Sequence, residues 1–186
     1  MDQVSAPLPL RQRGTSLIEV LVTIIILTIG LLGLAGLQSR LQASEMEAYQ
    51  RSQALILLQD MASRIAANRK NAATYATATP LGGTDACPAS GGTRQQDDAA
   101  EWCRALQGAS ETSGGTRVGA MVGGRGCVEA LADGSSYLVT VAWQGLTPIS
   151  APAPTCGQGL YNGGTACTND RCRRVITTVV RIGDLT

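Results

Sequence analysis

The feature that most constrains the fold is an almost uninterrupted apolar run of 21 residues, from Leu17 to Leu37, in a chain of 186. An α-helix of that length rises about 30 Å, which matches the hydrocarbon core of a bilayer. Glu19 is the only charge within it. Arginines precede the run and glutamates follow it, so the positive-inside rule places the short N-terminal end in the cytoplasm. The run predicts a single-pass inner-membrane helix with a periplasmic C-terminal part.

Six cysteines lie beyond this run and none lies before it. Their even number on one side of the membrane predicts disulfides formed in an oxidising compartment. They lack the paired C-x-x-C spacing of a structural zinc site. Local pairing is favoured, Cys87 with Cys103, and the other four are left to form two pairs among themselves. The six are Cys87, Cys103, Cys127, Cys156, Cys167 and Cys172.

The composition excludes most familiar hydrolase mechanisms. There is no histidine, which removes the commonest general base and the usual partner of a nucleophilic serine or cysteine. The 15 basic and 14 acidic residues do not indicate a polycationic nucleic-acid surface. No catalytic, cofactor-binding or metal-binding constellation is found, so we expect a protein that is not an enzyme, needs no cofactor and does not bind nucleic acid.

Three local patterns are interpreted as ordinary structure. The segment Gly123–Gly126 lacks the lysine and hydroxyl residue of a phosphate loop and is interpreted as a flexible turn. The basic cluster Arg171, Arg173 and Arg174 has no interleaved aromatic residues and is interpreted as solvated. The acidic residues within 97–101 lack the spacing of a calcium loop.

Helical sequence continues beyond the apolar run to about Asn68, because neither proline nor glycine interrupts it. Apolar residues at spacings of three, four and seven define one face, which we expect to pack against the rest of the chain. The run ALILLQDM at 54–61 is apolar on most sides, which indicates deep burial or contact with a neighbouring subunit. The expected face comprises Leu37, Leu41, Ala48, Leu55, Leu58, Ala62 and Ile65.

The remaining chain is expected to form a small α+β head. Residues 71–115 are rich in alanine, threonine, glycine and serine, and predict a long surface loop with a short helix at 97–106. Consecutive strands without intervening helices favour an antiparallel sheet. β-Branched and aromatic residues predict strands strongly at 136–143 and 175–182, and weakly at 117–122.

The junction R-Q-R-G-T-S-L-I-E carries the strongest functional signal. Gly14 is a small residue suited to an extended chain at the membrane face, as a protease site requires. Cleavage after it would leave Thr15 with a free amine. Glu19 then lies in the first helical turn, where the helix dipole favours a carboxylate. Holding that charge in an apolar layer costs on the order of a few kcal/mol, so Glu19 should have a cationic partner.

This junction closely resembles that of the type IV prepilins. The resemblance implies a leader, 1–14, that prepilin peptidase removes. It implies a transmembrane assembly helix, 15–37, and a periplasmic pilin-like head, 38–186, that includes the amphipathic half of the helix. It also implies N-methylation of Thr15, and pairing of Glu19 with the N-terminal amine of the adjacent subunit. The family usually has phenylalanine as the first mature residue, where this chain has threonine.

More narrowly, the segments GLLGLAGLQSRLQ and CRRVITTVVRI resemble minor pilins of the PilV kind. That resemblance implies a structural subunit that joins other minor pilins and primes pilus assembly on the inner-membrane platform. It would then ride with the major pilin into the extracellular fibre, at the tip, and help to present a tip adhesin. The alternatives are a type II secretion pseudopilin, or an adhesive or DNA-binding subunit whose specificity lies in 71–115 and 144–174.

Three glycines recur at every third position within the apolar run: Gly30, Gly33 and Gly36. Small residues let membrane helices approach closely, whereas glycine also weakens a helix in other surroundings. The resemblance to pilins, whose helix can lose order here within a fibre, implies a role in flexibility. Close packing and flexibility both remain open.

Two other interpretations of the N-terminus compete with this one. A secretory signal could end at the small-x-small site Gly33-Leu34-Ala35, although the apolar stretch is longer than an ordinary signal core and carries Glu19. A plain membrane anchor explains the length but not Gly14 placed before a glutamate within the membrane.

We therefore predict that the mature protein begins at Thr15, because Gly14 is the only small residue between the basic leader and the apolar run. N-terminal sequencing of protein extracted from membranes measures this directly. A start near Gly36 would support the secretory-signal interpretation instead.

Overall fold

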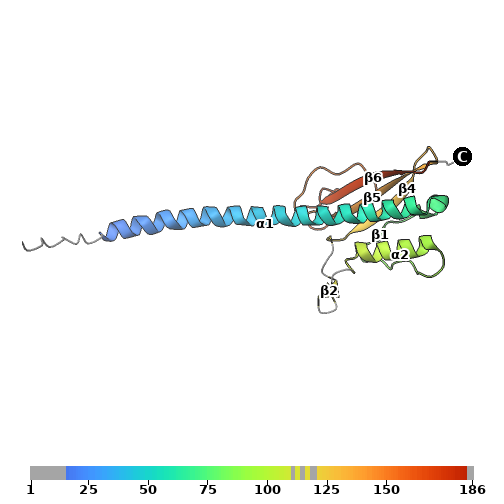
Figure 1. Cartoon of the computed structure of the whole chain (residues 1–186). Helices are drawn as coiled ribbons and strands as arrows, with labels where there is room; N and C mark the ends of the chain where they lie inside the picture. The colour runs from blue at the N-terminus through green and yellow to red at the C-terminus, as the bar shows by residue number, and fades with distance from the viewer. Residues whose placement is uncertain (1–15, 110–111, 114–115, 118–120, 184–186) are drawn as a thin grey trace, which may run out of the picture. The chain divides into compact units, whose positions relative to one another are not determined.

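The computed structural model describes residues 16–109, 112–113, 116–117 and 121–183. The chain forms two compact units, Met1–Gln42 and Ala43–Thr186, and each is described by itself. Figure 1 labels the elements. They are α1 (Leu17–Ala67), the 3-10 helix η1 (Arg69–Tyr75), β1 (Leu81–Gly82), α2 (Arg94–Leu106), β2 (Thr112–Ser113), β3 (Thr116–Arg117), β4 (Arg125–Ala130), β5 (Ser136–Gln144) and β6 (Arg173–Arg181).

The sheet of the second unit confirms the expected α+β fold. Four antiparallel strands lie in the order β1-β4-β5-β6, and β2 pairs with β3 in a separate ribbon. The central strand β5 is almost wholly buried, as its β-branched and aromatic residues predict. Both strongly predicted strands are confirmed, as β5 and β6.

The weak strand prediction at 117–122 holds at Arg117 but was wrong at 121–122. β3 ends at Arg117, Met121–Gly124 form a turn, and residues 118–120 lie outside the described residues. The strand that was not predicted is β4, which starts at Arg125. Its sequence, RGCVEA, has a single β-branched residue, so pairing with β5 rather than intrinsic propensity makes it a strand.

Helix α1 ends at Ala67, one residue before the predicted end, but the predicted packing face was wrong in part. Leu58 and Ile65 are buried, whereas Leu55 is 42 % exposed and Ala48 is exposed. The apolar run at 54–61 offers several faces of similar hydrophobicity, so contacts with the sheet and α2 decide the rotation. Leu55 and Ile56 are left exposed. The buried face comprises Gln50, Ala54, Leu58, Met61 and Ile65.

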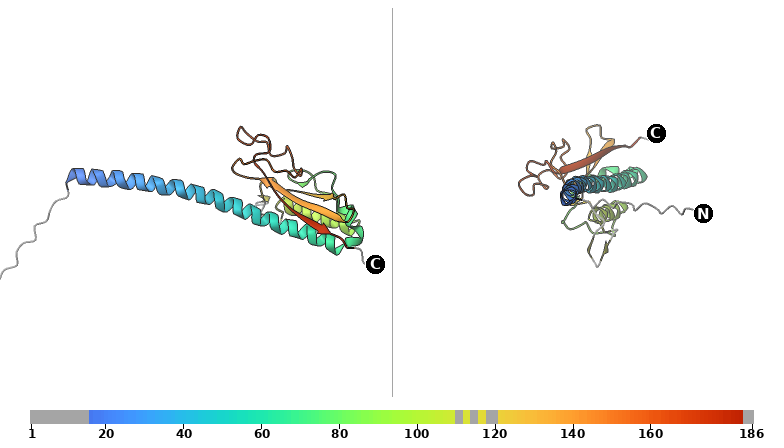
Figure 2. Two further views of the ribbon diagram at one scale, coloured as in Figure 1. Left: turned by 90° about the horizontal axis from the view of Figure 1, so that it is seen from above. Right: turned by 90° about the vertical axis from the view of Figure 1, so that its left-hand side faces the viewer.

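The expected long loop at 71–115 also needs correction, because it contains η1, β1 and a longer α2 than predicted. A capping box starts α2: Thr93 accepts a hydrogen bond from the N–H of Gln96, whose side chain accepts one from the N–H of Thr93. Figure 2 shows the second half of α1 running between β6 and α2. Trp102 of α2 is fully buried and donates a 2.9 Å hydrogen bond to the carbonyl of Leu57.

Arg64 links α1 to α2 through three carboxylates. Its guanidinium lies 3.0 Å from Asp60, 2.8 Å from Asp98 and 2.8 Å from Glu101. Burial lowers the pKa of Arg64, but hydrogen bonds to Glu101, Asp60 and Asp98 outweigh it and raise the pKa above its usual value. Asp98, with a side chain only 4 % exposed, also accepts a hydrogen bond from Tyr75. Burial first, and then this bond, raise the pKa of Tyr75.

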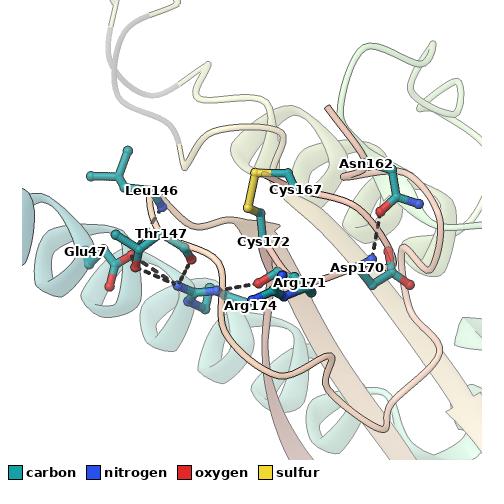
Figure 3. Close-up of a disulfide and its surroundings, with 9 residues drawn as sticks. All are labelled: Glu47, Leu146, Thr147, Asn162, Cys167, Asp170, Arg171, Cys172 and Arg174. Atoms are coloured by element: carbon teal, nitrogen blue, oxygen red, sulfur yellow. Dashed lines mark hydrogen bonds and ion pairs between the residues drawn. A yellow bond between two sulfur atoms is a disulfide. The ribbon is translucent and has the colours of Figure 1, made fainter. Parts of the chain in front are cut away.

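All six cysteines form disulfides, as predicted. Cys87 pairs with Cys103, and this disulfide joins the loop after β1 to α2. The open pairings resolve as Cys127 with Cys156 and Cys167 with Cys172. The first of these ties β4 to the long loop between β5 and β6, and the second closes a small ring just before β6 (Figure 3).

We predict unequal losses of stability when the last two disulfides are removed. Replacing both cysteines of the Cys127–Cys156 pair with alanine should lower the free energy of unfolding by about 4 kcal/mol, against about 2 kcal/mol for the Cys167–Cys172 pair. The longer bridge closes 29 residues and the shorter one 5, so the longer removes more entropy from the unfolded chain. Urea unfolding of the detergent-solubilised protein measures both, and equal losses would contradict the explanation.

Candidate functional site

The candidate assembly region is the exposed apolar part of α1. Gly14 and Thr15 lie outside the described residues, which start at Ser16. The carbonyl of Ser16 accepts hydrogen bonds from the N–H groups of Glu19, at 2.9 Å, and Val20, at 3.2 Å. Glu19 therefore lies in the first turn of the helix, as predicted, where unpaired N–H groups favour a negative charge. Its side chain is exposed and makes no ion pair with any described residue.

The surface of this segment is apolar, and none of the described residues packs against it. By length and composition it meets the criteria for a membrane-spanning helix, with a mean hydropathy of 2.7 and no part of that window buried. Its threonine hydroxyls are satisfied internally: Thr23 and Thr28 each donate a 2.8 Å hydrogen bond to the carbonyl three residues earlier. Such a surface suits contact with lipid or with other helices.

The three glycines of the segment are helical. A Cβ atom built at Gly30, Gly33 or Gly36 would meet nothing within 4 Å, so no contact with the described residues requires glycine there. Any packing role concerns another chain, and any flexibility role concerns a different environment. Both stay predictions.

The second unit contains a groove of about 490 Å³ beside the start of β6. One wall is the Ser44–Arg51 stretch of α1 and the other is the start of β6 with the loop that follows β5. Apolar side chains and four charged ones share the lining. The apolar residues are Trp143, Ile149, Pro152, Val175 and Ile176, and the charged residues are Glu47, Arg51, Arg173 and Arg174.

Glu47 fixes the loop and β6 to α1 at this groove (Figure 3). One of its carboxylate oxygens accepts from the guanidinium of Arg174 at 3.2 Å and from the hydroxyl of Thr147 at 3.3 Å. It also accepts from the N–H of Leu146 at 3.2 Å. Arg174 donates in turn to the carbonyl of Thr147 at 2.7 Å. These bonds satisfy Glu47 within the fold.

The arginine cluster next to Cys172 is not the solvated group that we expected. Arg171 is exposed, but Arg173 is only 2 % exposed and donates to the carbonyls of Pro152, Pro154 and Cys156. Its Nε lies 3.5 Å from a carboxylate oxygen of Asp170. A guanidinium has five donors in a fixed fork, so one arginine can serve several carbonyls of an irregular loop. Two of the three arginines, Arg173 and Arg174, therefore bond to groups within the fold.

The glycine-rich segment begins with a turn, as predicted, but that turn is packed rather than flexible, and Arg125 and Gly126 belong to β4. The hydroxyl of Tyr161 donates a 2.8 Å hydrogen bond to the carbonyl of Gly123, and the guanidinium of Arg125 lies 5.5 Å from the Tyr161 ring centroid. Burial raises the pKa of Tyr161 to about 12, so its phenol stays a neutral donor. Gly126 lies against Trp102, where a Cβ would be 2.2 Å from the indole ring. Glycine here permits packing rather than phosphate binding.

The groove was not predicted from the sequence, because its charged residues come from distant positions. Glu47 and Arg174 are 127 residues apart. Arg51 lies in a polar helical stretch, and nothing in the neighbouring sequence distinguishes it from other exposed charges. The one available signal was the CRRVITTVVRI segment, whose two arginines directly precede a strongly predicted strand.

Two family models match the chain. The prokaryotic N-terminal methylation motif matches residues 9–35, and the type IV pilin Tt1218 family matches residues 36–97. Together they support the type IV prepilin family and a pilin subunit, which is a structural protein. The methylation motif and the exposed apolar helix fit a membrane-anchored pilin. Comparison with curated proteins and with solved structures gave no match.

We predict that Arg173→Leu lowers the free energy of unfolding by about 3 kcal/mol, because it leaves several buried carbonyls and Asp170 without their donor. Residues 146–160 should also become sensitive to protease. Arg171→Leu, which removes an exposed neighbouring charge, is the matched control and should have little effect. Urea unfolding and limited proteolysis measure both effects, and equal behaviour of the two variants would contradict the role given to Arg173.

Proposed function

We propose that this chain, whose N-terminal half matches two pilin-related families, is a minor pilin that primes type IV pilus assembly and enters the fibre at its tip. The observation that carries the proposal is Gly14 and Thr15 directly before an apolar helix that has Glu19 in its first turn and a surface on which no described residue packs. A membrane anchor needs only the helix. Assembly explains both the cleavable junction and the carboxylate within the apolar segment.

Processing would supply the charge that Glu19 needs. Prepilin peptidase would cut after Gly14 and free the amine of Thr15, which is also the proposed site of N-methylation. Glu19 is four positions after Thr15, so a contact with that amine within one chain is feasible. In an assembling fibre, however, the amine of an incoming subunit also enters the apolar layer. Pairing it with Glu19 of the neighbour removes two unpaired charges from that layer at once.

The minor role rests on the resemblance to PilV and on the head. Three disulfides, a long loop before β6 and a groove on the head suit a subunit with specific neighbours rather than only identical ones. The proposed partners are other minor pilins, the major pilin, the inner-membrane assembly platform and a tip adhesin. The head would first face the periplasm and then the exterior of the cell.

A pseudopilin of a type II secretion system would share the N-terminal junction and its chemistry. Deletion of the gene separates the two functions. Loss of surface pili and twitching, with normal release of secreted proteins, is expected for a minor pilin. The opposite pattern would assign the chain to secretion.

For the assembly mechanism we predict that Glu19→Ala leaves membrane insertion and cleavage after Gly14 intact but reduces association with partner pilins at least severalfold. Glu19→Asp, with a shorter arm, should give an intermediate defect. Co-purification from membranes measures association, and the mass of the recovered chain reports cleavage.

Glu45→Ala is the matched control, since it removes an exposed carboxylate from the same helix outside the apolar run. It should associate normally. If Glu19→Ala is cleaved and associates as well as the parent protein, Glu19 has no role in assembly and the mechanism is wrong.

A further inference from the structure

Strand β6 has a free edge. It pairs with β5 along its whole length, and no described strand pairs with its other side. Gly145 donates to the carbonyl of Cys172 at 2.7 Å, and Ile182 donates to the carbonyl of Ser135 at 2.8 Å, so even-numbered residues at both ends of β6 point their backbone groups toward β5. Because these groups alternate along a strand, those of Val175, Thr177 and Val179 point outward.

This edge carries little of the protection that natural edges usually have. Nine residues long, it contains no proline, and its charges are confined to the ends. Thr177 and Val179 are exposed, Val179 by 49 %. Just before β6 the loop that follows β5 pairs with this edge through one hydrogen bond, from the N–H of Ile149 to the carbonyl of Arg171 at 2.8 Å. Beyond that bond, the described residues leave the edge open.

The open edge begins at the groove described above, since Val175 belongs to both. The groove offers an apolar wall, including Ile149 and Ile176, next to excess positive charge. Glu47 is already bound to Arg174 and the loop, and Arg173 is buried against loop carbonyls. Arg51, in contrast, is exposed and forms no ion pair with the described residues. A ligand here therefore meets an apolar surface and one unpaired guanidinium.

We propose that the β6 edge and this groove bind an extended segment of a different pilin subunit, one that carries a carboxylate beside an aliphatic side chain. The segment adds to the sheet by bonding to the outward N–H and C=O groups of Val175, Thr177 and Val179. Its aliphatic side chain packs on Ile149, and its carboxylate pairs with Arg51. The inference rests on the proposed function, because it requires an assembling pilin as partner.

Photo-crosslinking in native membranes tests the contact. A benzoylphenylalanine is placed at Thr177 or at Ile149 in the full-length chain, with Leu160 as the control position, since it is 52 % exposed and does not line the groove. We expect the first two positions, but not Leu160, to crosslink to a pilin subunit. Mass spectrometry of the joined peptides should identify a segment with an aspartate or glutamate next to an aliphatic residue.

Two pairs of variants separate backbone pairing from charge. Thr177→Pro removes an outward N–H without disturbing a bond to β5, whereas Thr177→Ala keeps that N–H, so only the proline variant should lose the crosslink from Ile149. Arg51→Glu should lower the yield by about tenfold, while Arg69→Glu, an equal change at an exposed site away from the groove, should not. Protease resistance of each variant confirms that the head is folded.

The outcomes are distinct for the inference and for the proposed function. If the chain co-purifies with partner pilins in a Glu19-dependent way but gives no crosslink from Thr177 or Ile149, the docking surface is wrong and the minor-pilin function stands. Crosslinks to a second copy of this chain, to phospholipid or to a segment without a carboxylate also overturn it. If no pilin associates with the chain by either method, both proposals fail.

Discussion

The arrangement of the head depends on the charge of Arg64. A carboxylate as buried as Asp98 is costly without a cation, and Arg64 supplies one while it also reaches Asp60 and Glu101. Hydrophobic contacts alone are not directional, whereas these bonds fix the position of α2 along α1. Once α2 is placed, Trp102 fills the space against Gly126 of β4. A chain without phenylalanine has few other large side chains with which to define its core.

The sequence predicted those elements whose signal is local. The membrane-length run, the end of α1, strands β5 and β6, and the pairing of Cys87 with Cys103 all follow from composition or short spacing. Strand β4 and the rotation of α1 did not, because neighbouring elements decide them. Near Leu55 most sides of α1 are apolar, so contacts with neighbouring elements bury Ala54 together with the predicted Leu58 and leave the predicted Leu55 exposed.

The functional regions divide in the same way. Glu19 and the glycines of the apolar run are recognisable because their neighbours in the sequence give them meaning, and the structure places Glu19 in the first turn as expected. The groove on the head joins residues that are far apart in the chain, and Arg173 has a role that only its surroundings reveal. Cationic side chains near a disulfide are usually solvated, yet here the irregular, proline-rich loop needs a donor for its carbonyls.

The tie between Glu47 and Arg174 has a mechanical consequence. When the head is pulled against α1, as a fibre under tension would do, load passes through contacts that begin at Glu47 and end at Arg64. Those two residues are about 26 Å apart along the helix. The hydrogen bonds and packed side chains between them would therefore be loaded in shear at the same time, instead of breaking one after another. The polar contacts at the two ends would resist sliding of the helix, so that the strength of the head under force exceeds that of any single bond within it.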